Sequence, residues 1–130
     1  MPAYDGRLFN PPAPLAHVVL RIPSTTTWLV DVPMLIDSGA DVTLVPRQSV
    51  ALLGAVIDPD THYEVIGFDG HKSTAQVVTL DLLFLRRAFK GRFLLTDQEC
   101  GVLGRDVLNH VALMLNGPRL SWDEQDVAGK

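Results

Sequence analysis

The residues best suited to chemistry lie in one short segment, Leu35-Ile36-Asp37-Ser38-Gly39-Ala40-Asp41. Asp37 ends an apolar run, small residues follow it, and a second apolar run starts at Val42. An isolated carboxylate beside apolar residues is costly to bury, so it requires a partner or a function. The small residues leave room for a second copy of the same loop. Two carboxylates held close together cannot both ionise and would share one proton, an arrangement that can activate water for hydrolysis.

The length and composition favour one domain with an ordinary core. The chain has 130 residues, of which 47% are hydrophobic, so a core can form without metals or disulfides. The formal net charge of -4 argues against a nucleic-acid partner, which requires a clustered basic face. The basic group Arg86-Arg87, Lys90 and Arg92 is expected at the solvated end of a hairpin.

Cysteine usage and apolar run lengths favour a cytoplasmic protein. Cys100 is the only cysteine, which is typical of a reducing compartment. The chain start lacks a signal-peptide pattern, and apolar stretches such as 77–85 are far shorter than the ~20 residues of a membrane-spanning helix. We therefore expect no membrane contact. The histidines lack metal-ligand spacing and no phosphate-binding loop occurs, so neither a metal nor a cofactor is expected.

Short β-strands are expected to position the Asp37 segment. Apolar and β-branched runs separated by turn residues dominate from Leu15 onward. Asp69-Gly70 between two such runs predicts a hairpin with a two-residue type I′ turn, and Pro46 and Gly54 are typical of a helix start and end. Strands are expected at 15–22, 28–36, 43–45, 64–68, 71–85, 92–96, 101–103, 111–115 and 119–122, a turn at 58–60, and helical segments at 47–53 and 105–109.

The ends of the chain differ in composition from the middle. Residues 1–14 contain four prolines and are expected to form an irregular N-terminal arm. Residues 15–122 are expected to form the folded domain, and 123–130 a frayed polar tail.

Three segments resemble those of a known family. Leu35 to Ala40 resembles the active-site signature of aspartic proteases, Asp-Thr/Ser-Gly-Ala/Ser after apolar residues. Val102 to Asp106 resembles the apolar-apolar-Gly-Arg-Asp/Asn segment before the last helix of retropepsins, the retroviral-type single-domain proteases. The Asp69-Gly70 hairpin lies between them, where that family carries its flap. The resemblance covers residues 15–121 and implies a mostly β, closed β-barrel-type acid-protease fold with one or two short helices and a flap hairpin.

The same resemblance implies an activity and an assembly. A retropepsin-like enzyme hydrolyses polypeptides with a water molecule activated by two aspartates. This chain has one Asp-Ser-Gly sequence, so the active form is expected to be a symmetric homodimer in which each subunit supplies Asp37 at the two-fold axis. By resemblance, Ser38 hydrogen-bonds across the axis, Gly39 lets backbone approach the substrate, and Ala40 packs beside the two acids.

Further residues receive supporting roles by resemblance. Asp41 is expected near the substrate backbone and paired with Arg105, whose guanidinium can donate two hydrogen bonds to a carboxylate. Gly104 and Asp106 flank that arginine in the matching segment. The flap tip would be Gly67-Phe68-Asp69-Gly70, which departs from the glycine-rich apolar tip of the viral enzymes.

Other interpretations remain open at this point. Asp37-Ser38-Gly39 could be an ordinary Asx turn, Asp69-Gly70 a hairpin without a lid function, and Arg105-Asp106 a helix start with a solvated charge pair. Asp41 could act only as a structural cap. The chain as a whole could be a non-catalytic retropepsin-like dimer that binds extended peptides or serves as an interaction domain.

Overall fold

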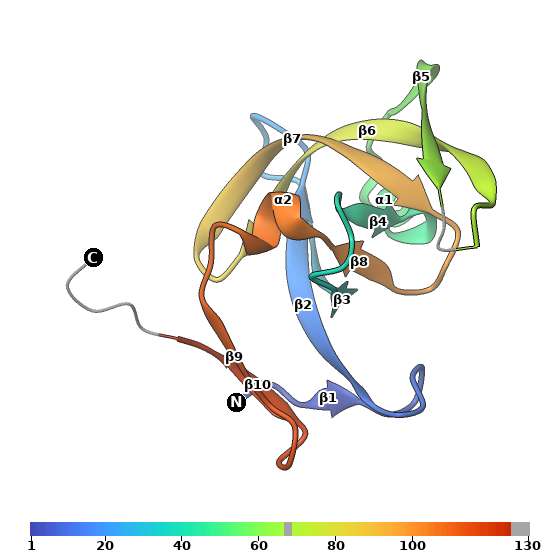
Figure 1. The fold of residues 1–130 in the computed structure, drawn as a ribbon. Coiled ribbons are helices and arrows are strands. Elements are labelled where there is room, and N and C mark those ends of the chain that lie inside the picture. The colour runs from blue at the N-terminus through green and yellow to red at the C-terminus, as the bar shows by residue number, and fades with distance from the viewer. Residues whose placement is uncertain (67–68, 126–130) are drawn as a thin grey trace.

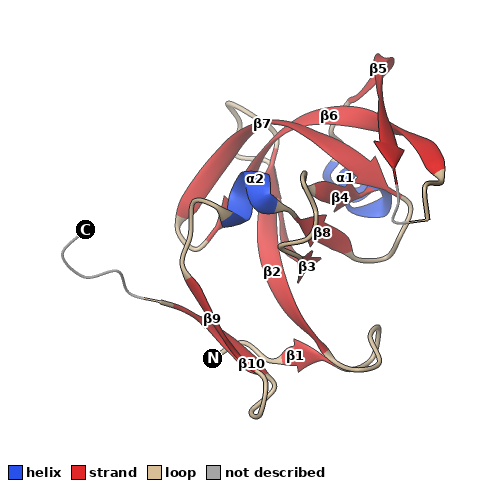
Figure 2. Ribbon diagram, in the orientation of Figure 1, coloured by secondary structure: helices blue, strands red, loops and turns tan. Residues whose placement is uncertain are grey.

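The computed structural model describes residues 1–66 and 69–125, and strands account for most of them (Figures 1 and 2). The strands are β1 (Tyr4–Asp5), β2 (Ala13–Arg21), β3 (Trp28–Ile36), β4 (Leu44–Pro46), β5 (Ile57–Ile66), β6 (Lys72–Phe84), β7 (Arg87–Thr96), β8 (Gly101–Leu103), β9 (Leu113–Asn116) and β10 (Ser121–Glu124). The helices among these residues are α1 (Arg47–Leu53) and α2 (Arg105–Leu108), both too short to cross a membrane.

The sheet returns upon itself. Its strand order is β1-β2-β3-β8-β4-β7-β6-β5, and β2 also pairs with β6, so β2, β3, β8, β4, β7 and β6 form a ring. β8 lies parallel to β3 and antiparallel to β4, and this short strand joins the two segments on either side of Asp37. The expected mostly β fold with one or two short helices is therefore confirmed, and the described residues contain two.

The core fills the ring because alternate strand residues point inward. On β6, Val78, Leu80 and Leu82 are fully buried and share one side of the strand. Val107 of α2 is also fully buried, so the short helix covers part of this core. Trp122 of β10 packs on Phe84 at 6.0 Å between ring centroids.

The N-terminal arm is more regular than the sequence predicts. Its first residues form β1 against the start of β2, and Ala3 bridges to Ser121. The backbone N–H of Tyr4 donates to the carbonyl of Leu120 at 2.8 Å, so the arm lies between β2 and the β9–β10 hairpin (Figure 1). The prediction of an irregular arm was wrong for residues 3–5, because the strands they pair with lie further along the sequence.

The polar tail was expected to begin at residue 123, but β10 continues to Glu124. Asp123 pairs with Met114 and Glu124 with Leu113, and the backbone N–H of Gln125 donates to the carbonyl of Ala112 at 2.7 Å. These pairings order a segment whose polar composition suggested fraying. Residues 126–130 lie outside the described residues.

The β5–β6 hairpin differs from the predicted two-residue turn. Ile66 pairs with Lys72, so residues 67–71 connect the strands. Asp69 accepts a hydrogen bond from the backbone N–H of His71 at 2.9 Å, and Gly70 takes φ 78. The Asp69-Gly70 pair is thus part of a longer loop, since the aspartate side chain stabilises its own backbone turn.

Residues 58–60 were expected to form a turn, but they lie within β5 at a register shift. Asp58 accepts hydrogen bonds from the backbone N–H of Asp60 at 2.9 Å and from the hydroxyl of Thr61 at 2.7 Å. The local turn chemistry is therefore present, but it produces an irregularity that the strand absorbs.

Candidate active site

Asp37 lies directly after β3, where the ladder with β8 ends. Its backbone N–H donates to the carbonyl of Leu103 at 3.1 Å, which extends the parallel pairing of Ile36 with Leu103 by one residue. The half-buried carboxylate accepts a hydrogen bond through Oδ1 from the backbone N–H of Gly39 at 2.9 Å. Among the described residues, no side chain or backbone group donates to its other oxygen. That oxygen is available to a partner from outside the chain.

Arg105 holds the loop that follows Asp37. Its backbone N–H donates to the carbonyl of Ala40 at 2.9 Å, and Nη1 donates to the carbonyl of Ser38 at 2.9 Å. Nη2 donates to Oδ1 of Asp41 at 2.6 Å, so the ion pair implied by the resemblance is present. The Asp41 side chain is 82% exposed, and such a surface pair adds at most about 1 kcal/mol to stability. The arginine therefore matters more for loop geometry than for the stability of one chain.

Behind this ion pair lies a second contact, between the buried Thr43 and the exposed carboxylate of Asp106, that the sequence did not reveal. The hydroxyl of Thr43 donates to Oδ1 of Asp106 at 2.6 Å, and the backbone N–H of Thr43 donates to Oδ2 at 3.1 Å. The same hydroxyl accepts from the backbone N–H of Gly104 at 3.1 Å. Thr43 is 1% exposed, and its hydroxyl provides the buried N–H of Gly104 with an acceptor that water cannot supply. It joins the end of the Asp37 loop to the start of α2.

Gly101 and Gly104 must be glycines because a Cβ would not fit at either position, and not because of their backbone angles. A Cβ on Gly104 would lie 2.5 Å from the carbonyl carbon and oxygen of Val42. A Cβ on Gly101 would lie 2.4 Å from the sulfur of Met34 and 2.5 Å from the carbonyl oxygen of Leu44. Both positions let β8 and α2 approach the loop closely enough for the hydrogen bonds just described.

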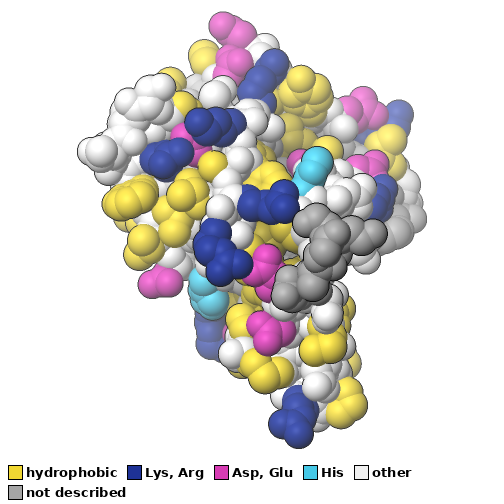
Figure 3. All heavy atoms as spheres, turned by 90° about the vertical axis from the view of Figure 1, so that its left-hand side faces the viewer, with side chains coloured by type: hydrophobic (Ala, Val, Ile, Leu, Met, Phe, Trp, Pro, Cys, Tyr) yellow, Lys and Arg dark blue, Asp and Glu magenta, His cyan; other side chains and the backbone are white. Residues whose placement is uncertain are grey.

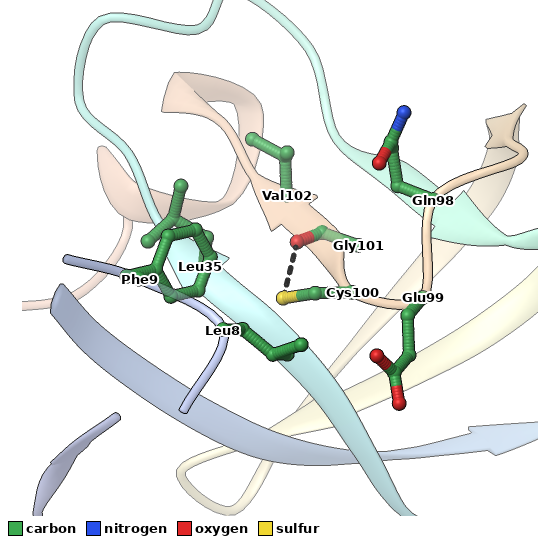
Figure 4. Close-up of a pocket in the computed structure, with 8 residues that line it drawn as sticks. All are labelled: Leu8, Phe9, Leu35, Gln98, Glu99, Cys100, Gly101 and Val102. Carbon is green, nitrogen blue, oxygen red and sulfur yellow. Dashed lines mark hydrogen bonds between the residues drawn. The ribbon is translucent and has the colours of Figure 1, made fainter. Parts of the chain in front are cut away.

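A pocket of about 280 Å³ lies beside this loop, between the N-terminal arm and β8 (Figure 4). Leu35 and Val102 are cross-strand partners in its wall, and Leu35 lies two residues before Asp37. Since alternate residues share one side of a strand, the pocket and Asp37 belong to the same side of the sheet. The remaining lining residues are Leu8, Phe9, Gln98, Glu99, Cys100 and Gly101.

The wall of this pocket is mainly apolar, with polar groups from the segment before β8. Cys100 is half-buried, donates to the carbonyl of Gly101 at 3.2 Å, and has its pKa raised to about 11 by burial. The thiol is therefore neutral at physiological pH. Glu99 of the lining also pairs with Arg7 of the arm at 3.2 Å. Leu8 and Phe9 were not predicted as site residues; two apolar side chains within a proline-rich arm were the available signal.

The predicted site residues fall into two groups. Asp37, Ser38, Gly39, Ala40 and Asp41 form a hydrogen-bonded loop that Arg105 holds, and Thr43 joins the end of this loop to Gly104 and Asp106. Asp69 and Gly70 lie apart, in the loop between β5 and β6, where Lys72 pairs with Glu64 at 3.4 Å. Gly67 and Phe68, predicted for the flap tip, lie outside the described residues.

Comparison with known proteins supports the fold. The structure of EIAV protease complexed with the inhibitor HBY-793 superposes with a TM-score of 0.57 and 21% sequence identity, covering 75% of this chain and 86% of that one. No protein-family model matches the sequence, and no curated protein matches it. The chain therefore has a retropepsin-like fold.

Proposed function

We propose that the protein is a homodimeric aspartic endopeptidase in which the Asp37 carboxyls of two subunits activate one water molecule. The observation that carries this proposal is the Asp37 loop itself. It ends an apolar strand, is held by Arg105 and Thr43, and lies on a retropepsin-like fold. The half-buried Asp37 and the exposed Ser38 and Gly39 that follow it leave space for the same loop of a second subunit.

The chemistry follows from two carboxyls that share one proton. The ionised carboxylate takes a proton from water as the water oxygen attacks the peptide carbonyl carbon, and the protonated carboxyl donates its proton to the carbonyl oxygen. The tetrahedral intermediate then collapses, the C–N bond breaks, and the departing amine receives a proton from the acid pair. No covalent link to the protein forms.

One chain supplies half of this machinery, and its surface offers a place for a second copy. On the terminal hairpin, Met114, Leu115 and Leu120 are 47%, 53% and 47% exposed. Exposed large apolar side chains on this hairpin support the proposal that it contacts a second copy. β9 also has a free edge among the described residues, because β10 lies on one side of it in the two-stranded sheet and no strand pairs with its other side.

The pocket supports a polypeptide as the substrate. Its volume of about 280 Å³ suits one side chain of a substrate. The apolar wall that Leu35, Phe9 and Val102 contribute favours an apolar substrate side chain. An extended peptide would run past the Asp37 loop with one apolar side chain in the pocket. In this proposal the β5–β6 hairpin, with Asp69 and Gly70 in its loop, closes over the peptide and excludes water.

Replacing Asp37 by asparagine tests the catalytic proposal. The variant keeps an acceptor for the Gly39 N–H but loses the proton-transfer group, so cleavage should fall by about 10²–10⁴-fold or more. Asp31→Asn is the matched control, because Asp31 is an exposed residue of β3, the strand that leads to Asp37, and asparagine tolerates its φ of 59. Cleavage of a peptide library would be followed by mass spectrometry, and dimer formation by sedimentation.

A wild-type protein that forms dimers and binds peptides but never cleaves them would contradict this function. It would favour the alternative of a non-catalytic dimer that binds extended peptides, for which the apolar pocket alone would suffice. Equal cleavage by wild type and Asp37→Asn would reject the role of the acid.

A further inference from the structure

A groove separate from the pocket near Asp37 lies between β7 and the segment that begins with α2. Two neighbouring cavities of about 400 Å³ and 380 Å³ share Ala88, Phe89 and His110 in their linings. Lys90, Arg92 and Asp106 line the first cavity, and Arg87 lines the second. None of the residues from Leu35 to Asp41 belongs to either lining. We call this site the β7 groove.

The β7 groove follows the edge of a strand. Every residue from 88 to 93 lines the larger cavity, whereas a groove on a sheet face would be lined by alternate residues. On the side away from β6, β4 pairs only with Leu94, Leu95 and Thr96. Within residues 1–66 and 69–125, no strand pairs with the segment 87–93 on that side.

The direction of the free backbone groups follows from the turn between β6 and β7. Phe84 pairs with Arg87, and the two residues between them, Leu85 and Arg86, have φ 51 and 63. This is a two-residue hairpin turn with positive φ at both positions, whose closing residues exchange both backbone hydrogen bonds. Because the pairing then continues without a shift, the N–H and C=O groups of Ala88, Lys90 and Arg92 face the groove.

The side chains around this edge are cationic. Arg87, Lys90 and Arg92 are exposed, and none of them belongs to an ion pair among the described residues. The groove's acid, Asp106, already accepts hydrogen bonds from Thr43 through both oxygens. Figure 3 views the molecule from the side that carries α2 and the β6–β7 turn, and Lys and Arg side chains gather across it. This local charge is positive although the chain's formal net charge is -4.

The groove also has an apolar contact surface. The Phe89 ring lies 6.0 Å from the His110 ring, between centroids, and both residues line each cavity. An extended segment placed along β7 would set alternate side chains against this aromatic pair and against the cations. The free edge offers both donors and acceptors, which suits a peptide backbone better than a phosphodiester chain, whose oxygens only accept.

We propose that the β7 groove binds an acidic, extended segment of a partner protein, which adds to the sheet as a strand beside β7. The segment's backbone pairs with Ala88, Lys90 and Arg92, and its carboxylates lie against the cationic side chains. This binding does not depend on the proposed peptide cleavage, because it uses no residue of the Asp37 loop.

The test uses the full chain and a fluorescein-labelled peptide that alternates Glu with Val, with fluorescence anisotropy as the readout. Lys90→Glu should weaken binding about tenfold, since it replaces attraction by repulsion at the groove. Arg119→Glu is the matched control, because it makes the same charge change at an exposed position outside the groove and should leave binding unchanged. Binding should also weaken as salt is raised.

Amide hydrogen exchange measured by NMR distinguishes strand addition from charge attraction alone. Bound peptide should slow exchange at Ala88, Lys90 and Arg92, whereas a peptide N-methylated at alternate residues should not. Unchanged exchange at these amides would overturn the proposal, as would equal weakening by Lys90→Glu and Arg119→Glu. Tighter binding of a single-stranded oligonucleotide than of the acidic peptide would also overturn it and indicate nucleic acid as the ligand.

Discussion

Replacing Gly104 by alanine should destabilise the fold through contacts with backbone atoms that cannot rotate away. The added Cβ would lie 2.5 Å from the carbonyl carbon and oxygen of Val42 and 2.9 Å from its nitrogen. Either Val42 or α2 must move, and that movement also lengthens the 3.1 Å hydrogen bond from Gly104 to Thr43. The backbone angle is not the cause, because φ of Gly104 is -91.

The magnitude combines three effects. Overpacking destabilises the fold by about 1–3 kcal/mol, and the weakened hydrogen bond adds about 0.5–1.5 kcal/mol. Alanine also lowers the conformational entropy of the unfolded chain, which offsets about 0.4–1 kcal/mol of this loss. The free energy of unfolding should therefore fall by about 0.5–4 kcal/mol, with a central value of ~2 kcal/mol that lowers Tm by roughly 6–10 °C for a domain of this size.

Thermal and urea unfolding followed by circular dichroism would measure the change. Gly117→Ala is the control, because a Cβ there meets nothing within 4 Å and should change stability by no more than about 0.5 kcal/mol. If Gly104→Ala and Gly117→Ala unfold at the same temperature, the close approach of α2 to Val42 does not limit stability, and the reasoning fails.

Three further predictions concern the same region. Thr43→Val leaves the Gly104 N–H without an acceptor and should cost about 1–3 kcal/mol in urea unfolding; Thr43→Ser keeps the hydroxyl and should lose clearly less. Arg105→Lys cannot hold both Ser38 and Asp41, so it should weaken the proposed dimer more than the fold; an unchanged dimer constant in sedimentation would reject this. Because burial raises the pKa of Cys100 from 9.0 to about 11, little thiolate is present at pH 8. Alkylation of Cys100 by iodoacetamide at that pH should therefore be roughly 100-fold slower in the folded than in the unfolded chain, and its rate should rise up to about pH 11. Equal labelling rates in the folded and unfolded chains would contradict that burial.

Several elements could be predicted because their signals are local. The bounds of α1 match the expected 47–53, since Pro46 suits the helix start and Gly54 ends it in the left-handed region at φ 82. The strand over 28–36 and the short one over 101–103 also have the expected bounds. In each case neighbouring residues carry enough information to place the ends.

Other elements depend on partners that are distant in sequence. β7 begins at Arg87 rather than at the expected residue 92, because pairing with β6 extends through a charged stretch that contains Gly91. β1 forms for the same reason, since its two residues have no strand signal apart from their pairing with β2. A sequence pattern reports the preference of each residue for strand or helix, whereas β1 and the start of β7 form because a neighbouring strand pairs with them.

The candidate site shows the same division. The resemblance indicated Asp37, Asp41 and Arg105, whose types and order form a compact motif. The importance of Thr43 was not foreseen, because a threonine in an apolar run is typical of any strand. Its hydroxyl gains meaning only from Asp106, which lies 63 positions further along the chain. Roles of this kind require the three-dimensional contact.

The pairing of the arm with the terminal hairpin has a consequence for how the molecule assembles. The indole N–H of Trp122 donates to the carbonyl of Leu15 at 2.9 Å, a contact between residues 107 positions apart. Joining residues so far apart costs loop-closure entropy in the unfolded chain, and a formed ring lowers that cost by bringing the arm and the terminal hairpin near each other, so we expect the ends to join after the ring has formed. The arm that walls the pocket beside Asp37 would then be the last part of the protein to mature, and peptide binding could begin only once folding has finished.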